Sequence, residues 1–295
     1  LLLTTKEEKT QIETNRAKKK HGRKPERVEL LQESSSFGAR IRGISNDQQN
    51  ASHALDKIES DYKYKLETTP KFVEKSLDWL AQAQHEDGSW GAGVSSSQQV
   101  RDPHAVKGDP ATTSFAAMAF LRSGHTPKKG KYKDVVRRAT EALVTVVEEA
   151  PKEGPRITNL TGTQPQAKMG AFVDTSLTAR YLARVLNEFP KKEKLRKRVD
   201  KAIDKCIAKI QGSQQKDGSW SGGGGWAPVL QSSLAGQALE LAQAVGKQVD
   251  QKALDRARDN QKGNIDPSSG KAKADTAAGV ELYAFASAQR ATAAE

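Results

Sequence analysis

The chain uses one phrase of amino acids twice. Residues 71–90 read KFVEKSLDWLAQAQHEDGSW, and residues 201–220 read KAIDKCIAKIQGSQQKDGSW. In both copies apolar residues recur at i, i+4 and i+7, which predicts one apolar face of an α-helix. The Asp-Gly pair that follows predicts a sharp turn, and the tryptophan after it is expected to fold back as a large apolar plug. A repeated helix and turn predicts an all-α protein built from repeating units.

Eight residues occupy equivalent positions in the two copies of this phrase. We expect all of them to be structural: Gln84, Asp87, Gly88, Trp90, Gln214, Asp217, Gly218 and Trp220. The glutamine lies near the predicted helix end, where its side chain can pair with backbone groups that the helix leaves unsatisfied. The indole N–H of each tryptophan is expected to find an acceptor once the ring is buried.

Four further segments open runs that are rich in alanine and leucine. The openings are residues 112–115, 174–177, 231–234 and 275–278, and the runs read FAAMAFL, LTARYLARVL, LAGQALELA and AGVELYAFA. Almost wholly apolar runs predict buried helices. Charge-rich amphipathic segments alternate with them, at residues 71–84, 132–149, 194–211 and 249–261. The alternation predicts four helical hairpins, and no strand pattern of period two is present.

The repeated phrase resembles the QW repeat of the squalene–hopene cyclase and protein prenyltransferase superfamily. Segment 109–139, DPATTSFAAMAFLRSGHTPKKGKYKDVVRRA, is similar to the segment between repeats in bacterial proteins described as prenyltransferase/squalene-cyclase-like. The resemblance covers roughly residues 70–290 and implies a divergent bacterial member. It implies an α/α toroid, in which inner and outer helices alternate around a central cavity. Four hairpins are fewer than a complete toroid of the family usually has, so an incomplete ring is expected.

The first 69 residues differ from the rest of the chain. They carry 14 Lys and Arg against 11 Asp and Glu, with no Trp and several long polar runs. Such a segment cannot bury enough apolar area to fold alone. We therefore expect a charged, extended or partly helical N-terminal arm at 1–69, and a toroid domain at 70–295. The arm holds the predicted partner-binding cluster, which consists of Lys18, Lys19, Lys20, Arg23 and Lys24.

The formal net charge is +12, of which the arm contributes +3 and residues 70–295 the remaining +9. A basic surface favours anionic partners, either an acidic protein surface or anionic lipid headgroups. Aromatic residues are only 5% of the chain and do not alternate with the basic ones, which argues against nucleic acid as partner. The sequence contains no run of about 18 apolar residues, so it predicts no membrane span. A periplasmic or membrane-peripheral location is slightly favoured over a cytoplasmic one.

The catalytic motifs of the superfamily are incomplete in this chain. The cyclase resemblance implies an Asp-x-Asp-Asp-Thr-Ala motif, but residues 272–277 read AKADTA, so Ala274 stands where the proton donor would be. The prenyltransferase resemblance implies a zinc ion held by Asp, Cys and His. Asp204 and Cys206 match the Asp-x-Cys spacing, but no histidine follows them. We therefore expect no metal and no cofactor.

Three carboxylates are the candidate catalytic residues if the chain is an enzyme. Asp109, Asp174 and Asp275 lie at or just before the predicted N-termini of inner helices. Each is expected first to act as a helix N-cap, because a carboxylate there accepts hydrogen bonds from unpaired backbone N–H groups. In a toroid these helix ends also face the central cavity, which is where a site would lie.

The sequence favours a non-catalytic toroid scaffold or accessory subunit that binds a partner protein or a larger, membrane-associated assembly. The first alternative is a terpene cyclase or prenyltransferase-like enzyme acting on a polyprenyl or other lipid-like substrate. The second is a lyase or binder of an acidic polysaccharide, which the net charge suits. The missing acid motif and zinc ligands weigh against catalysis.

Overall fold

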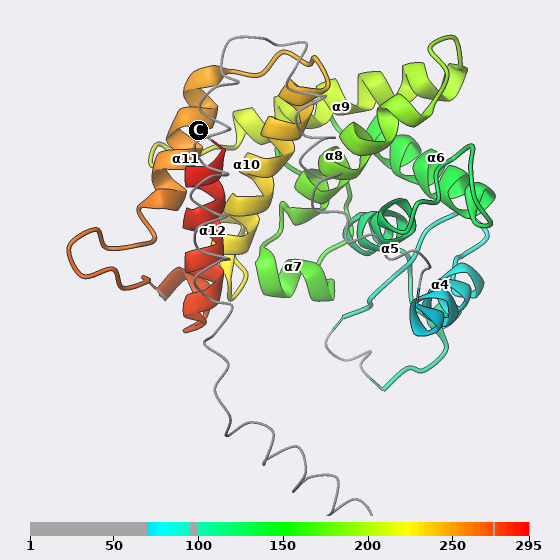
Figure 1. Ribbon diagram of the computed structural model, residues 1–295, viewed down its shortest axis with the longest axis horizontal. Coiled ribbons are helices and arrows are strands. Elements are labelled where there is room, and N and C mark those ends of the chain that lie inside the picture. Colours follow the sequence, from blue (N-terminus) through cyan, green and yellow to red (C-terminus); the bar gives the residue numbers. More distant parts are fainter. Residues whose placement is uncertain (1–69, 95–98, 274, 295) are drawn as a thin grey trace, which may run out of the picture. The chain divides into compact units, whose positions relative to one another are not determined.

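The computed structural model describes residues 70–94, 99–273 and 275–294. Within these residues the chain is all-α, as predicted, with two isolated β-bridges and no strand. The described residues hold nine α-helices: α4 (Lys71–Gln82), α5 (Pro110–Arg122), α6 (Lys133–Glu149), α7 (Gln164–Met169), α8 (Val173–Val185), α9 (Lys194–Gly212), α10 (Pro228–Ala244), α11 (Gln251–Lys262) and α12 (Glu281–Ala293) (Figure 1). The predicted arm and its basic cluster lie outside the described residues.

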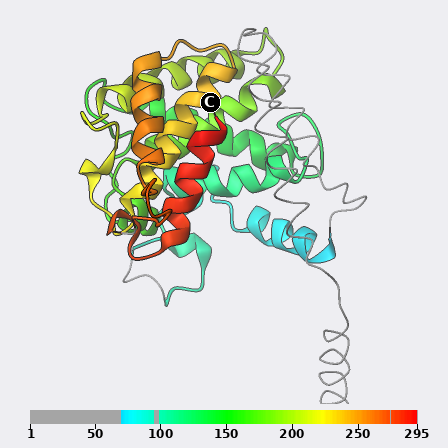
Figure 2. The same cartoon turned by 60° about the vertical axis from the view of Figure 1, so that its left-hand side comes forward.

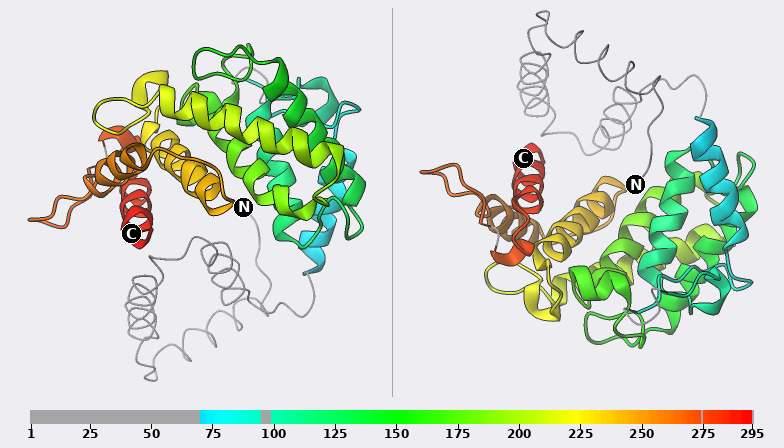
Figure 3. Two further views of the ribbon diagram at one scale, coloured as in Figure 1. Left: turned by 90° about the horizontal axis from the view of Figure 1, so that it is seen from above. Right: turned by 90° about the horizontal axis from the view of Figure 1, so that it is seen from below.

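The helices pack as two rows that alternate along the chain. The inner row consists of α5, α8, α10 and α12, each packed on the next (Figure 3). The outer helices α6, α9 and α11 cover the inner row, α4 lies against α5, and α11 lies beside α12 (Figure 2). Helix α8 is the most enclosed, with eleven of its thirteen residues buried. The amphipathic segments of the sequence are thus the outer helices, and the apolar runs fall in the inner row.

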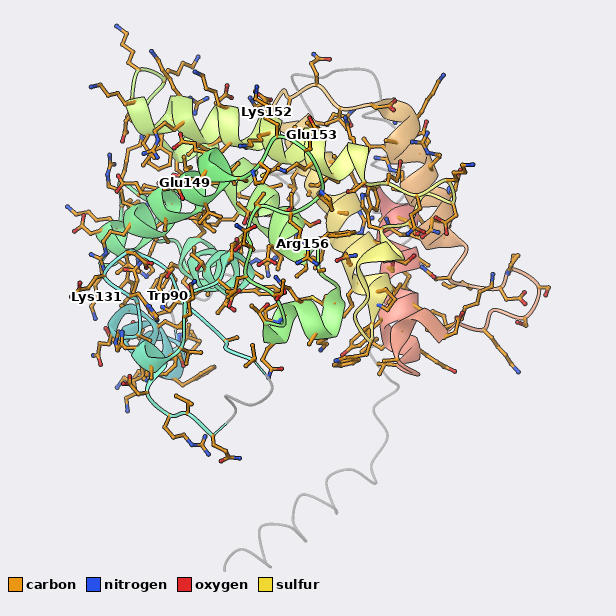
Figure 4. All side chains as sticks on the ribbon, turned by 180° about the vertical axis from the view of Figure 1, so that it is seen from behind. Trp90, Lys131, Glu149, Lys152, Glu153 and Arg156 are labelled. Carbon is orange, nitrogen blue, oxygen red and sulfur yellow. The ribbon has the colours of Figure 1, made fainter. Side chains whose placement is uncertain are left out.

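The two tryptophans of the repeated phrase occupy equivalent corners. Both are almost fully buried, and Trp90 is labelled in Figure 4. The indole Nε1 of Trp90 donates to the carbonyl oxygen of Leu80 at 2.8 Å, and that of Trp220 donates to Ile210 at 2.7 Å. Each ring therefore folds back onto the helix that precedes it and satisfies a carbonyl near the helix C-terminus.

The glutamine of each phrase joins its turn to the next outer helix. Nε2 of Gln84 donates to the carbonyls of Gly88 and Val135, both at 3.0 Å, and its Oε1 accepts from Arg138 of α6. The second copy repeats these contacts on α11, with Gln214 bonded to Gly218, Ala253 and Arg256. We call this arrangement the glutamine clamp. It fixes where each turn meets the following outer helix.

The glycine of each phrase is required by the same contact. Gly88 has φ +87° and Gly218 has φ +84°, which is left-handed backbone that favours glycine. A Cβ atom at Gly88 would lie 2.5 Å from the carbonyl oxygen of Arg138, and one at Gly218 would lie 2.1 Å from that of Arg256. Glycine therefore lets the turn approach the outer helix closely enough for the glutamine clamp to form.

The junction between α6 and α9 lacks the phrase and is held by lysines instead. Nζ of Lys205 donates to the carbonyls of Glu148 and Ala150, at 3.1 and 2.5 Å. Nζ of Lys209 donates to Gly154 at 3.0 Å and to Glu153 at 3.3 Å, in the loop that carries the labelled Glu153 in Figure 4. Lys205 thus satisfies carbonyls at the C-terminal end of α6 that helix geometry leaves unpaired, and Lys209 holds the loop that follows.

The structure departs from the sequence expectations in two elements. Helix α7 has only six residues and was not predicted, because so short a segment shows no periodicity. The last apolar run was expected to open its helix at residues 275–278, but these form a 3₁₀ turn, and α12 begins at Glu281. The left-handed backbone at Ala278 (φ 54°) and Gly279 (φ 74°) separates the two. No described helix is long and apolar enough to cross a membrane.

The clash at Gly218 gives a stability prediction. Gly218→Ala should lower the free energy of unfolding by about 1–2 kcal/mol for the left-handed backbone, and by a further ~1–3 kcal/mol because the methyl group meets the Arg256 carbonyl. Gly246→Ala is the matched control, since Gly246 has φ +85° but open space around its Cβ position. Urea denaturation of both variants measures the difference, and equal losses would contradict the close approach.

Candidate functional site

The N-terminal ends of the inner helices carry a row of buried polar side chains. Asp109 is the N-cap of α5, where its Oδ1 accepts from the backbone N–H of Thr112 at 2.7 Å. Its Oδ2 accepts from the N–H of Ala92 at 3.2 Å, in the segment that follows the first tryptophan corner. The N-cap expected at Asp109 is therefore present, and both carboxylate oxygens are used by backbone groups.

Asp174 caps a neighbouring helix and not its own. It is the second residue of α8, and its Oδ1 accepts from the N–H of Ala111 in α5 at 3.1 Å. Its Oδ2 accepts from Nε2 of Gln166 in α7 at 2.7 Å. The expectation that Asp174 is the N-cap of α8 is wrong, because its carboxylate points to the adjacent inner helix.

Gln231 of α10 repeats the relation of Asp174 one helix further on. Its Oε1 accepts from the N–H of Phe172, immediately before α8, at 2.8 Å. Its Nε2 donates to the carbonyl of Trp220 in the second tryptophan corner. Asp174 and Gln231 thus each cap the start of the preceding inner helix, which brings the N-termini of α5, α8 and α10 together and makes these helices parallel.

Burial changes the acidity of the two carboxylates. Asp109 is 2% exposed and Asp174 is 1% exposed. The pKa of Asp174 is raised to about 6, chiefly because burial disfavours the charged form, and the nearby charge of Asp109 raises it further. Burial also raises the pKa of Asp109, against the opposing effect of its backbone hydrogen bonds. A carboxyl group with a pKa near 6 suits proton transfer, but all four oxygens already hold hydrogen-bond donors.

Asp275 does not join this row. It begins the 3₁₀ turn Asp275–Ala277 and is exposed to solvent, whereas Asp109 and Asp174 are buried. The expectation that Asp275 caps an inner helix is wrong, because α12 begins six residues later. The structure therefore brings together two of the three candidate carboxylates.

The residues that match the zinc spacing face in opposite directions. Cys206 is fully buried in the core, where burial raises the pKa of its thiol to about 12. Asp204 lies at the surface of the same helix, and its Oδ2 accepts from Nζ of Lys247 at 3.0 Å. Over the described part of the chain, no group of three or more His, Cys, Asp or Glu side chains could hold a metal ion.

A second group of charged residues lies in the C-terminal halves of the inner helices. We define the arginine cluster as four residues, Arg122 of α5, Arg180 and Arg184 of α8, and Arg290 of α12. The pKa of Arg180 is lowered to about 10, first by burial and then by the charges of the other three guanidinium groups. The charges of Arg122, Arg184 and Arg290 therefore all act on Arg180.

The sequence held a signal for the arginine cluster. Arg180 and Arg184 stand four residues apart in the run LTARYLARVL, which is otherwise mostly apolar. Residues at i and i+4 lie on the same face of a helix. The two guanidinium groups of this mostly apolar helix are therefore expected on one face. The contributions of Arg122 and Arg290 depend on tertiary packing and could not be read from the sequence.

Apolar side chains continue the same face toward the helix N-termini. Phe115, Met118 and Arg122 lie at i, i+3 and i+7 of α5, so they share one stripe. Phe115 is 46% exposed, although it is a large apolar residue of an inner helix. Leu177 shares a stripe of α8 with Arg180 and belongs to an apolar cluster with α7 and α10. Leu177 is buried, so the exposed stripe is that of α5, which is apolar at Phe115 and Met118 and basic at Arg122.

The raised pKa of Asp174 predicts a pH dependence of stability. Because the carboxyl group binds its proton more tightly in the folded protein, its contribution to stability is fully present below about pH 4. That contribution is lost as pH rises through about 6. The unfolding free energy of the wild type minus that of Asp174→Asn should therefore fall between pH 4 and pH 7, by about 3 kcal/mol at most. Urea denaturation across this range tests it, and a flat or rising difference would refute it.

Comparison with known proteins adds no assignment to this geometry. The chain matches no protein-family model, no curated protein and no solved structure. The resemblance to the QW-repeat superfamily consequently depends on the repeated phrase itself, and any function follows from the site alone.

Proposed function

We propose that the helical part of the chain is an α/α toroid that acts as a non-catalytic scaffold or accessory subunit and binds a partner protein. An α/α toroid is a double row of helices that closes on itself, and α5 to α12 form a double row in which the N-terminal ends of α5, α8 and α10 lie together. The charges of Arg122 and Arg290, on the first and last inner helices, both act on Arg180 of α8. This proximity supports an arrangement in which the free faces of the inner helices turn toward a common space.

The observation that carries the proposal is how the candidate acids are used. Asp109 and Asp174 hold backbone N–H groups of the fold, so their hydrogen-bonding capacity is committed to structure. The side chains left available on the inner row are of the kind that recognises a ligand. They are the exposed aromatic ring of Phe115 and the exposed guanidinium group of Arg122, and both residue types are enriched at protein interfaces.

The second candidate function is an enzyme acting on an anionic lipid-like substrate. The feature that favours it is the stripe of α5 on which the exposed Phe115 and the partly buried Met118 precede the basic Arg122. An apolar chain with an anionic head could lie along such a face. The raised pKa of Asp174 would supply an acid only if the carboxyl group left its partners in α5 and α7.

Partner binding at the inner face can be tested by photo-crosslinking in cells that naturally produce the protein. A photoreactive phenylalanine analogue at position 115 should give a discrete crosslinked protein product, because this ring is exposed on the inner face. The same analogue at Trp79 is the matched control, since Trp79 is 57% exposed on α4 in the outer row. A product of equal yield at both positions, or none at position 115, would argue against the scaffold.

Catalysis is tested directly with the purified full chain. Incubation with squalene and with a polyprenyl diphosphate should give no cyclic or transferred product, because both oxygens of each buried carboxylate, Asp109 and Asp174, already hold hydrogen-bond donors. Product analysis by gas chromatography and mass spectrometry provides the measurement. Turnover that is lost in Asp174→Asn but kept in Asp204→Asn would instead establish the second candidate.

A further inference from the structure

Helix α4 carries two large aromatic side chains that are exposed to solvent. Phe72 is 72% exposed and Trp79 is 57% exposed. They lie seven residues apart, so they share one stripe of the helix. Ser76 lies between them on this stripe, and its hydroxyl donates to the carbonyl of Phe72 at 2.8 Å. The polar group of the stripe is therefore paired within the helix, and the exposed surface is apolar over two turns.

Lysines border this aromatic stripe on one side. Lys75 lies three residues after Phe72 and four before Trp79, so it stands beside the stripe. Lys71 lies one turn before Lys75, on the same edge. Both lysine side chains are exposed. An apolar stripe with cations along its border is therefore open to solvent on α4.

A lysine-rich loop is attached to the same edge of α4. Asp78, three residues after Lys75, accepts from Nζ of Lys131 and from the hydroxyl of Tyr132, the latter at 2.8 Å. Tyr132 is buried and packs against Phe120 of α5, so it fixes the loop in place. Lys131 is labelled in Figure 4. The loop and the first residue of α6 carry four exposed lysines, Lys128, Lys129, Lys131 and Lys133.

The lysines outnumber the acids around them. Residues 71–82 and 126–134 together hold six lysines against three carboxylates, which are Glu74, Asp78 and Asp134. Asp78 is already paired with Lys131. Among the residues that the structure describes, no carboxylate lies within ion-pair distance of the other five lysines. This surface therefore carries excess positive charge that an anionic partner would complement.

The residue types indicate the kind of anionic partner. The two segments contain lysine and no arginine, and the lysine ammonium group is a point charge without the planar fork that matches a protein carboxylate. Exposed Trp and Phe beside lysines are typical of helices that lie between lipid headgroups and acyl chains. A second copy of the chain would fit poorly, because a symmetric contact would bring the lysines of both copies together.

We propose that α4 and residues 126–134 dock on an anionic lipid surface. Phe72 and Trp79 enter the headgroup region, and the lysines lie against the lipid phosphates. We call these two segments the lipid-binding patch. The patch lies outside the inner row, so the proposal does not rest on the scaffold function.

Co-sedimentation of the full chain with vesicles tests the proposal. Vesicles of equal parts phosphatidylserine and phosphatidylcholine should bind the protein at least about tenfold more tightly than pure phosphatidylcholine vesicles, because several lysines lie near the anionic surface. Added salt should weaken this binding. Equal binding to both kinds of vesicle, or binding to neither, would overturn the proposal.

The aromatic contribution is measured with a matched pair of tryptophan variants. Trp79→Ser should weaken binding to the anionic vesicles by about fivefold or more, because an apolar ring no longer leaves water. Trp226→Ser is the control, since Trp226 is 53% exposed in the loop before α10, and it should bind within about twofold of the wild type. Circular dichroism checks that both variants are helical. Equal losses in the two variants would contradict insertion of Trp79.

The lysine contribution has its own matched pair. Lys128→Gln, Lys129→Gln should weaken binding about tenfold or more, because each lysine near an anionic membrane surface contributes separately. Lys216→Gln, Lys252→Gln removes the same charge from two exposed lysines, in the turn after α9 and in α11, and should bind within about twofold of the wild type. If both double variants lose binding equally, net charge alone decides and the patch is refuted.

Fluorescence quenching locates the contact independently of affinity. The four tryptophans of the chain are Trp79, Trp90, Trp220 and Trp226, and Trp90 and Trp220 are buried. In Trp226→Phe the exposed indole is therefore that of Trp79. Brominated lipid in the anionic vesicles should quench this variant strongly and Trp79→Phe much less. The same quenching in both variants would place the contact elsewhere and overturn the proposal.

Other occupants of the patch are outcomes of the same assay. A soluble glutamate-rich peptide should displace the protein from the vesicles poorly, because it offers no apolar phase to the two rings. Full displacement at an equal concentration of negative charge would overturn the lipid surface in favour of an acidic protein. Vesicle binding that survives the Trp79 and Lys128 variants, but is lost when the basic cluster of residues 18–24 is changed to glutamine, would assign membrane contact to the arm and overturn the patch.

Discussion

The starts of α5 and α8 are each held by a side chain that the next inner helix supplies. A helix leaves its first backbone N–H groups without partners inside the helix, and these groups must be satisfied when they are buried. Asp174 supplies the acceptor for α5, and Gln231 supplies it for the segment that opens α8. Because each acceptor comes from the first turn of its own helix, the contacts align the inner helices in parallel and set their register. The glutamine clamps then place the outer helices on this frame.

Side chains that hold the starts of the inner helices are not free to act on a ligand. A carboxylate buried at Asp174 lowers stability near neutral pH, and the fold retains it because two donors, from α5 and α7, require an acceptor there. Removing such an acid from its partners would leave buried N–H groups unpaired, which costs about 1–3 kcal/mol for each. A reaction that used Asp174 as an acid would therefore lower the stability of the fold. At the other end of the inner row Arg122 is exposed to solvent, whereas Arg290 is held by Glu240 and Gln261.

The sequence predicted those features that depend on local patterns. The spacing of apolar residues located the outer helices and most of the inner ones, and the repeated phrase marked both tryptophan corners, because periodicity and turn residues are encoded within a few positions. Long-range relations could not be read in this way. Asp174 looks like an N-cap in sequence, yet its partner lies 63 residues away in α5. Arg290 belongs to the arginine cluster only because α12 packs beside α10. The segment that begins at Asp275 resembles the one that begins at Asp174, so both were expected to open an inner helix. The left-handed backbone at Ala278 instead separates Asp275 from α12.

The last hairpin shows how this exception connects the fold to the proposed site. Without an equivalent of Asp174 or Gln231 at Asp275, α12 is joined to its neighbours near its C-terminal end by different means. Arg290 bridges to Glu240 of α10 and to Gln261 of α11. The other end of α12 remains more open, with Leu282 69% exposed. The residue that fastens α12 is therefore also a member of the arginine cluster. A substitution at Arg290 would therefore release α12 from both α10 and α11, because the same guanidinium group bonds Glu240 and Gln261.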